Sequence, residues 1–61
     1  MSAAEESLKR AEELLGRLEQ TRERLEAADD PEAAIDILAE LADIAKQVEA
    51  ALEDARREAS D

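Results

Sequence analysis

The residues Ala28-Asp29-Asp30-Pro31-Glu32 decide the fold, because an otherwise continuous helical pattern stops and restarts there. A proline disfavours helical dihedral angles at the residue before it, so the first helix must end near Ala28. Proline is tolerated at the first position of a helix, where its missing N–H costs nothing, and Asp30 is a favourable N-cap. We therefore expect helices over about residues 3–28 and 31–59 with a turn at 29–30. A connection this short makes the two helices antiparallel.

The composition favours helices and limits how the chain can be stabilised. Its 61 residues include one glycine, one proline and no aromatic residue, and 43% of them are charged. Chains of this size usually need disulfides, a metal or association to complete a core. The sequence contains no Cys and no His, so disulfides and the usual zinc sites are excluded. The prediction is one all-α domain over residues 1–61, an antiparallel two-helix hairpin that associates.

The first helix carries one apolar row. Ser2 and Glu5 form a capping box at its start. Apolar residues then follow at spacings of four and three, at Ala4, Leu8, Ala11, Leu15, Leu18 and Leu25. Leu14 widens this row on one side. Arg22 interrupts the row, and we interpret it as a side chain whose stem packs while its head reaches water; alternatively, it selects the correct register.

The second helix carries more apolar surface than one neighbour can cover. Its central row is flanked by one row on each side, so that three rows share one face: Ala34, Leu41, Val48 and Ala55; Ile37, Ile44 and Ala51; and Leu38, Ala45 and Leu52. A coiled-coil seam to a single partner uses two rows, so three rows indicate two neighbours. Within the hairpin we expect Leu18 to face Leu41 and Leu15 to face Ile44.

These rows predict a non-catalytic interaction module. The apolar face would either bind a second copy, giving a homodimer that forms an antiparallel four-helix bundle, or dock on a larger protein. The expected interface residues are Leu8, Leu15, Leu18, Leu25, Ile37, Leu38, Leu41, Ile44, Val48 and Leu52.

The net charge of −10, from 18 acidic and 8 basic residues, limits the partners. Nucleic acids and anionic membrane surfaces reward Lys and Arg, so neither is an expected partner. The acidic start of the chain, residues 1–6, does not resemble a signal peptide, and no apolar run reaches the roughly 18 residues of a membrane span. A cytoplasmic location is therefore expected.

Seven acids and no base lie between Leu25 and Ala45. This run supports an alternative function, in which the chain is an acidic regulator that occupies the basic site of a nucleic-acid-binding protein.

Catalytic and metal-binding groups are scarce. Without His, Cys or Tyr, a nucleophile would have to be Ser2, Ser7, Ser60 or Thr21, and we expect no enzymatic activity. The carboxylates of Asp36, Glu40 and Asp43 share one helical face that is expected to point outward into water. A di-iron bundle would pair such carboxylates with His, so no metal or cofactor is expected.

The segments Leu25-Glu26 and Leu52-Glu53-Asp54-Ala55-Arg56-Arg57 resemble the small subunit of bacterial exonuclease VII, a family of short helical hairpins. The resemblance covers about half of the chain, from the end of the first helix to Arg57. It implies a non-catalytic protein that docks on a large nuclease subunit. The glycine and aromatic residues usual in the second helix of that family are replaced here, with Ala42 and Asp43 at mid-helix. A designed hairpin would share the composition, although Gly16, Gln20-Thr21 and Arg22 are poor choices for a designed helix.

Moderate NaCl is expected to raise the melting temperature, because it screens repulsion among the acids between Glu26 and Asp43. Thermal unfolding followed by circular dichroism over a salt series measures this effect. Mg²⁺ or Ca²⁺ should act no more strongly than NaCl of equal ionic strength. A saturable effect of either ion at micromolar concentration would contradict the expected absence of a metal site.

Overall fold

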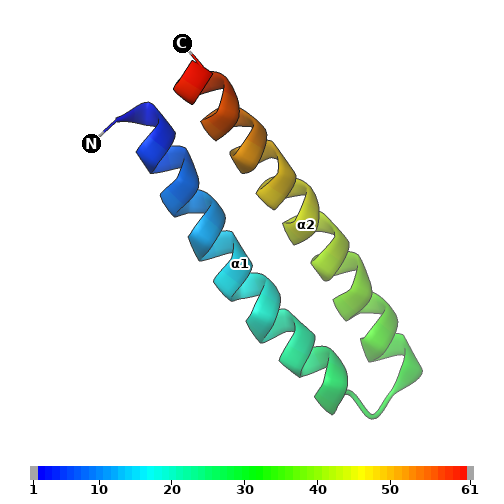
Figure 1. Cartoon of the computed structure of the whole chain (residues 1–61). Helices are drawn as coiled ribbons and strands as arrows, with labels where there is room; N and C mark the ends of the chain where they lie inside the picture. Colours follow the sequence, from blue (N-terminus) through cyan, green and yellow to red (C-terminus); the bar gives the residue numbers. More distant parts are fainter. Residues whose placement is uncertain (1, 61) are drawn as a thin grey trace.

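Two antiparallel helices make up the described part of the chain, residues 2–60 of a computed structural model. Helix α1 spans Ala3–Ala27 and helix α2 spans Pro31–Ser60. Figure 1 shows the two rods side by side, joined by one short connection, with both termini at the opposite end. The hairpin measures 47 × 15 × 10 Å along its principal axes. The prediction of an all-α hairpin is confirmed, and each helix ends within one residue of its expected bound.

Local chemistry accounts for the helix ends. The side chain of Ser2 accepts a hydrogen bond from the backbone N–H of Glu5 at 3.1 Å, which confirms the capping interaction at the start of α1. Ala28 leaves the helical conformation, with φ −70° and ψ 127°, and its N–H donates to the carbonyl of Leu25 at 3.2 Å, so three residues separate the end of α1 from Pro31. The carbonyl of Asp30 accepts from the N–H of Ala34 at 3.0 Å, so α2 starts at Pro31 with Asp30 in the N-cap position.

Two neighbouring rows of side chains on each helix form the seam between α1 and α2. Buried and half-buried residues of both helices recur at spacings of three and four, at Ala4, Ser7, Ala11, Leu14, Leu18, Thr21 and Leu25 in α1 and at Ala34, Ile37, Leu41, Ile44, Val48, Ala51 and Ala55 in α2. The densest part is a cluster against which Leu18 packs, made of Ala11, Leu14, Ile44, Val48 and Ala51. This is the heptad pattern of a two-stranded antiparallel coiled coil.

The predicted seam of α1 is wrong by one row. Leu14 is buried, at 6% exposed, whereas Leu15 and Leu8 remain 47% and 48% exposed. Both candidate seams share Ala4, Ala11, Leu18 and Leu25, and they differ in the second row. The structure buries Leu14 and Thr21, half-buries Ser7, and leaves Leu8, Leu15 and Arg22 outside the seam. The row that looks more apolar in the sequence is therefore not the one that faces α2.

The polar residues of the buried row are accommodated by hydrogen bonds. The Oγ1 atom of Thr21 donates to the carbonyl of Arg17 at 2.8 Å, and Oγ of Ser7 donates to Oε1 of Glu58 at 2.6 Å. A buried hydroxyl that donates a hydrogen bond avoids the cost of an unsatisfied polar group. Burying Thr21, which is 4% exposed, is therefore compatible with the seam.

Arg22 does not occupy the seam, contrary to the sequence interpretation. Its guanidinium lies 3.4 Å from Glu19 and 3.6 Å from Glu26, both on α1, and more than half of its side chain is exposed. Neither snorkelling from the seam nor register selection within the hairpin is therefore its role.

The register of the helix pair also differs from the expected one. Ion pairs place Arg10 level with Asp54 and Arg24 level with Glu40. Facing Leu18 with Leu41 and Leu15 with Ile44, as expected, would shift α2 by about one helical turn of 5.4 Å. The observed register instead puts Leu18 against the cluster that contains Ile44.

Replacing Gly16 with alanine should stabilise the hairpin by about 0.5–1 kcal/mol, because glycine is a poor residue for the interior of a helix. A Cβ atom at Gly16 would meet no heavy atom within 4 Å, and the residue is exposed. Urea unfolding of Gly16→Ala, followed by circular dichroism at 222 nm, measures the change. A loss of stability would show that another surface packs against this glycine.

Candidate protein-interaction surface

The two edges of the seam differ in character, and the difference defines a candidate interaction surface. At one edge, here called the ionic flank, arginines of α1 reach across to acids of α2. Arg10 lies 3.3 Å from Asp54 and Arg24 lies 3.2 Å from Glu40. Such residues flank the seam of a coiled coil and set the partner and its orientation.

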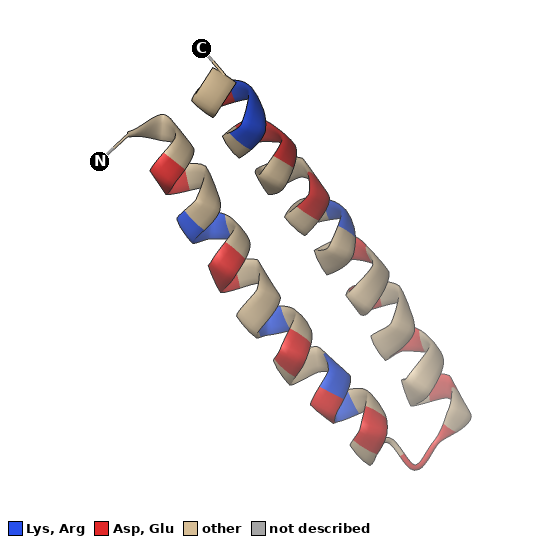
Figure 2. Ribbon diagram, viewed as in Figure 1, with Lys and Arg blue, Asp and Glu red and all other residues tan. Residues whose placement is uncertain are grey.

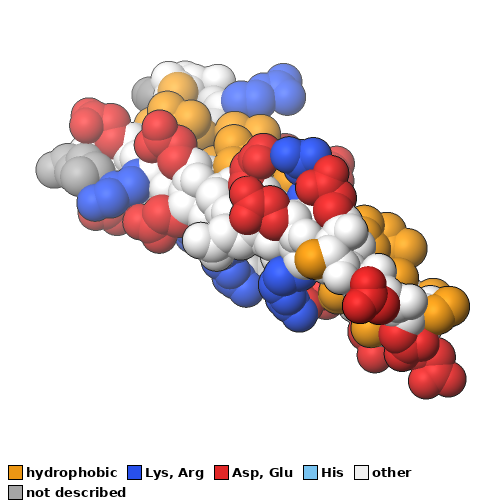
Figure 3. Space-filling model, turned by 90° about the horizontal axis from the view of Figure 1, so that it is seen from below, with side chains coloured by type: hydrophobic (Ala, Val, Ile, Leu, Met, Phe, Trp, Pro, Cys, Tyr) orange, Lys and Arg blue, Asp and Glu red, His pale blue; other side chains and the backbone are white. Residues whose placement is uncertain are grey.

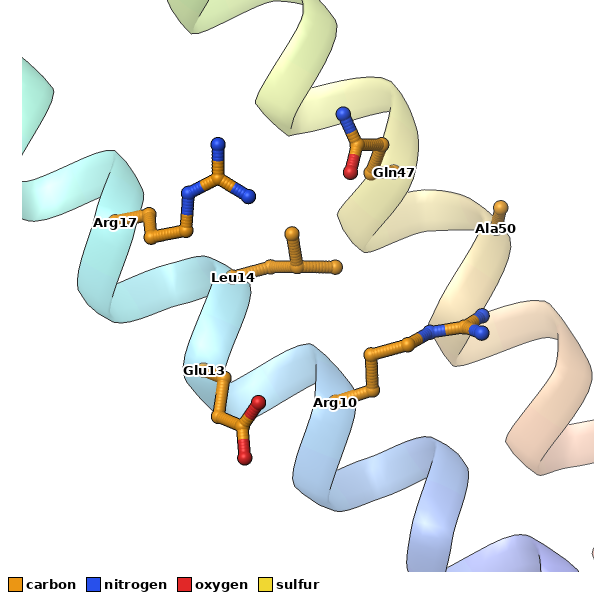
Figure 4. A pocket seen from close by; sticks show the side chains of 6 residues that line it. All are labelled: Arg10, Glu13, Leu14, Arg17, Gln47 and Ala50. Carbon is orange, nitrogen blue, oxygen red and sulfur yellow. The ribbon is translucent and has the colours of Figure 1, made fainter.

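Arg17 lies midway along the ionic flank and faces a neutral residue. It is seven residues from both Arg10 and Arg24, and the corresponding position of α2 is Gln47. Figure 4 shows Arg10 and Arg17 extending from α1 on either side of Leu14, with Gln47 and Ala50 across from them on α2. Within residues 2–60, Arg17 makes no ion pair within 4 Å. This edge of the hairpin is thus polar along its length.

The opposite edge is apolar and exposed; we call it the open face. It is formed by the large apolar side chains that the hairpin leaves in water: Leu8 and Leu15 of α1, and Ile35, Leu38 and Leu52 of α2, at 64%, 52% and 42% exposed for the last three. Leu8 and Leu15 are seven residues apart, as are Leu38, Ala45 and Leu52, so each set lies on one side of its helix. In Figure 3, hydrophobic side chains lie mainly along one long edge of the molecule, with charged side chains between them.

The two helices contribute to one continuous open face. Leu8 of α1 and Leu52 of α2 line the same shallow hollow near the open end of the hairpin, together with Ala55, Arg56 and Ala59. Leucines from different helices therefore meet across the seam. The open face runs parallel to the seam and extends from this hollow toward Leu38 and Ile35 near the loop.

The ten predicted interface residues fall into two groups. Ile37, Ile44 and Val48 are buried inside the hairpin, and Leu18, Leu25 and Leu41 are half-buried along its seam. Leu8, Leu15, Leu38 and Leu52 stay exposed and form most of the open face. Only the second group is available to a partner.

Ile35 belongs to the open face although the sequence interpretation did not place it in any apolar row. It precedes Leu38 by three residues, a spacing that puts two side chains next to each other on a helix. That spacing is visible in the sequence and could have identified Ile35.

The expected outward-facing group of carboxylates is divided. Glu40 turns toward α1 and pairs with Arg24, so the expectation that it points into water with Asp36 and Asp43 is wrong for this residue. Within residues 2–60, no group of three or more acidic side chains is arranged to hold a metal ion. The carboxylate of Glu40, which a metal ion at this face would need, is thus already paired with Arg24.

Charge is distributed unevenly along the hairpin, but both halves are acidic. Residues 16–45, toward the loop, carry nine acids and three bases, and the remaining residues carry nine acids and five bases. The half that contains the loop is therefore −6 and the open half −4. Figure 2 shows acids around the connection and no basic residue on the part of α2 next to it. Charge opposes the approach of two such chains, and orientation changes the size of that repulsion.

Comparisons with protein-family models, with curated proteins and with solved structures find no match to the chain. The resemblance to the exonuclease VII small subunit therefore stays a prediction. Within the described residues, neither helix has a stretch long and apolar enough to cross a membrane.

Gln47→Glu should complete the ionic flank by giving Arg17 an acidic partner. The expected gain in unfolding free energy is about 0.2–1 kcal/mol, because both side chains are exposed. A double-mutant cycle with Arg17→Gln, measured by urea unfolding, isolates the pair from the effect of adding one negative charge. The coupling should weaken in 1 M NaCl. Zero coupling at low salt would mean that Arg17 and Gln47 do not face each other.

Proposed function

We propose that this protein is a non-catalytic helical interaction module that binds its partner through the open face, and that the bound state is a four-helix bundle. The observation that carries the proposal is the contrast between the two edges of the seam. A hairpin adapted to water on both sides would have polar residues along both edges, whereas here one edge carries ion pairs and the other carries exposed leucines.

The size of the hairpin supports the same proposal. A chain of 61 residues has little core of its own, and one pair of helices buries one seam only. Covering the open face would add the exposed parts of Leu8, Leu15, Leu38 and Leu52 to the buried apolar surface. Each leucine is already about half-buried, so the gain is about half of the roughly 1.5–3 kcal/mol that full burial of a leucine provides. Two further helices placed against that edge give the geometry of a four-helix bundle.

The alternative, an acidic regulator of a nucleic-acid-binding protein, would use different residues. It depends on the exposed acids near the loop, among them Glu26, Asp30 and Asp36. Binding by these acids would weaken strongly in 1 M NaCl, whereas burial of leucines would persist. Docking on a larger protein subunit and a cytoplasmic location both stay predictions from the sequence.

Leu52→Gln should weaken association through the open face at least tenfold, because it removes a leucine from the covered surface. Glutamine and leucine have similar helix propensities, so the change does not act through the isolated helix. Sedimentation equilibrium at micromolar concentration, read by interference optics because the chain lacks aromatic residues, gives the mass relative to the 6.7 kDa monomer.

Ala39→Gln is the matched control, since Ala39 is exposed on α2 but lies outside the open face. Its association should equal that of the unaltered chain. Equal association of the Leu52→Gln variant and the control would contradict the proposal. Loss of association in 1 M NaCl would favour the acidic regulator instead.

A further inference from the structure

We propose that the open face is covered by a second copy of this chain, related by a two-fold axis that places the two loops at opposite ends of the assembly. In this arrangement α1 packs on α1 of the second copy and α2 packs on α2. The inference rests on the proposed function, because it names the partner of the same surface.

The open face is self-complementary about one point on α2. Leu38 and Leu52 lie seven residues on either side of Ala45. A two-fold axis at Ala45 therefore places Leu38 of each copy against Leu52 of the other. The small side chain at the axis lets the two α2 helices approach closely, so large residues pack beside small ones.

The same axis also suits α1. Leu15 is the central apolar residue of its exposed row, seven residues from Leu8 and seven from Arg22. The ion pairs Arg10–Asp54 and Arg24–Glu40 make Arg17 level with Gln47, so Leu15 and Ala45 lie within about one helical turn of the same level. One axis can thus pass between both helices, with Leu15 against its own copy and Leu8 against the aliphatic stem of Arg22.

The dimensions of the hairpin match those of a stable dimer. A face of 47 by 15 Å covers about 700 Å² on each copy, and the pair would bury about 1,400 Å² in total, within the usual range of specific interfaces. A two-fold interface uses the same patch on both copies, as the open face would here.

Charge selects the orientation. If the loops lay together, the acids next to them would gather at one end: Glu26, Asp29, Asp30, Glu32, Asp36 and Asp43 from each copy. Placing the loops apart separates Asp29 and Asp30 of the two copies by close to the 47 Å length of the hairpin, several times the Debye length of about 8 Å at physiological salt. Asp43, two residues from Ala45, lies near the axis and gains little from this separation. The same placement also brings Arg56 and Arg57 to within about a turn of Asp36 on the second copy.

The distance between two spin labels shows whether the loops of the two copies lie apart or together. The chain has no Cys, so Ala27→Cys gives one labelling site per copy, exposed and next to the loop. Double electron–electron resonance on the purified chain should give a separation of about 36 Å along the helices, because Ala27 of each copy lies twelve residues, at 1.5 Å each, from the axis at Leu15. Loops placed together would give a separation near 20 Å, about two helix diameters, and would overturn the proposed orientation.

Disulfide crosslinking is a second test of the orientation. With the axis at these positions, Leu15→Cys and Ala45→Cys should each form a disulfide-linked dimer alone, because each residue meets its own copy. If the two loops lay together, α1 would pack on α2 of the second copy. A disulfide-linked dimer would then form only in a mixture of the Leu15→Cys and Ala45→Cys variants. Ala39→Cys, outside the open face, is the control and should form no disulfide-linked dimer after oxidation.

The outcomes separate this inference from the proposed function. A fully helical monomer at micromolar concentration would overturn the second copy as partner, whereas the open face could still bind another protein. A dimer that Leu52→Gln leaves intact would overturn both, because the two copies would then meet elsewhere. A dimer that Leu52→Gln dissociates, with short label distances, would keep the function and the second copy but overturn the proposed orientation.

Discussion

Two helices can cover only one side of each other, and this limit governs the whole structure. Helix α2 carries three apolar rows, while α1 covers the central row and the one that contains Ile37, Ile44 and Ala51. The third row, with Leu38 and Leu52, stays exposed because residues 2–60 form no third helix that could cover it. The exposed surface is thus a direct consequence of hairpin geometry and of the width of the apolar face of α2.

The ionic flank and the open face lie at opposite edges of the seam. Pairs such as Arg24–Glu40 lie at the surface and contribute little free energy each. In the rotation of α1 that forms these pairs, Leu8 and Leu15 lie at the opposite edge. The exposed leucines of both helices thus lie on one side.

The seam shows how polar residues are tolerated between two helices while another apolar row stays exposed. Thr21 and Ser7 occupy positions that leucine could fill, and each donates a hydrogen bond, the first within α1 and the second to Glu58. Burying them costs less than it would without these bonds. The hairpin thereby keeps Leu8 and Leu15 for the open face and accepts a seam with a smaller apolar content.

The sequence by itself determined the two helices, their caps and their antiparallel order, because Asp30-Pro31 and the Ser2–Glu5 pair act through neighbouring residues. The three apolar rows of α2 also predicted a second neighbour for this helix. The sequence did not determine the rotation of α1, since the rows containing Leu14 and Leu15 differ by one position and both fit a helical period. Only the tertiary structure chose between them, because the choice depends on contacts such as Arg10–Asp54, between residues far apart in the chain and therefore invisible to local periodicity.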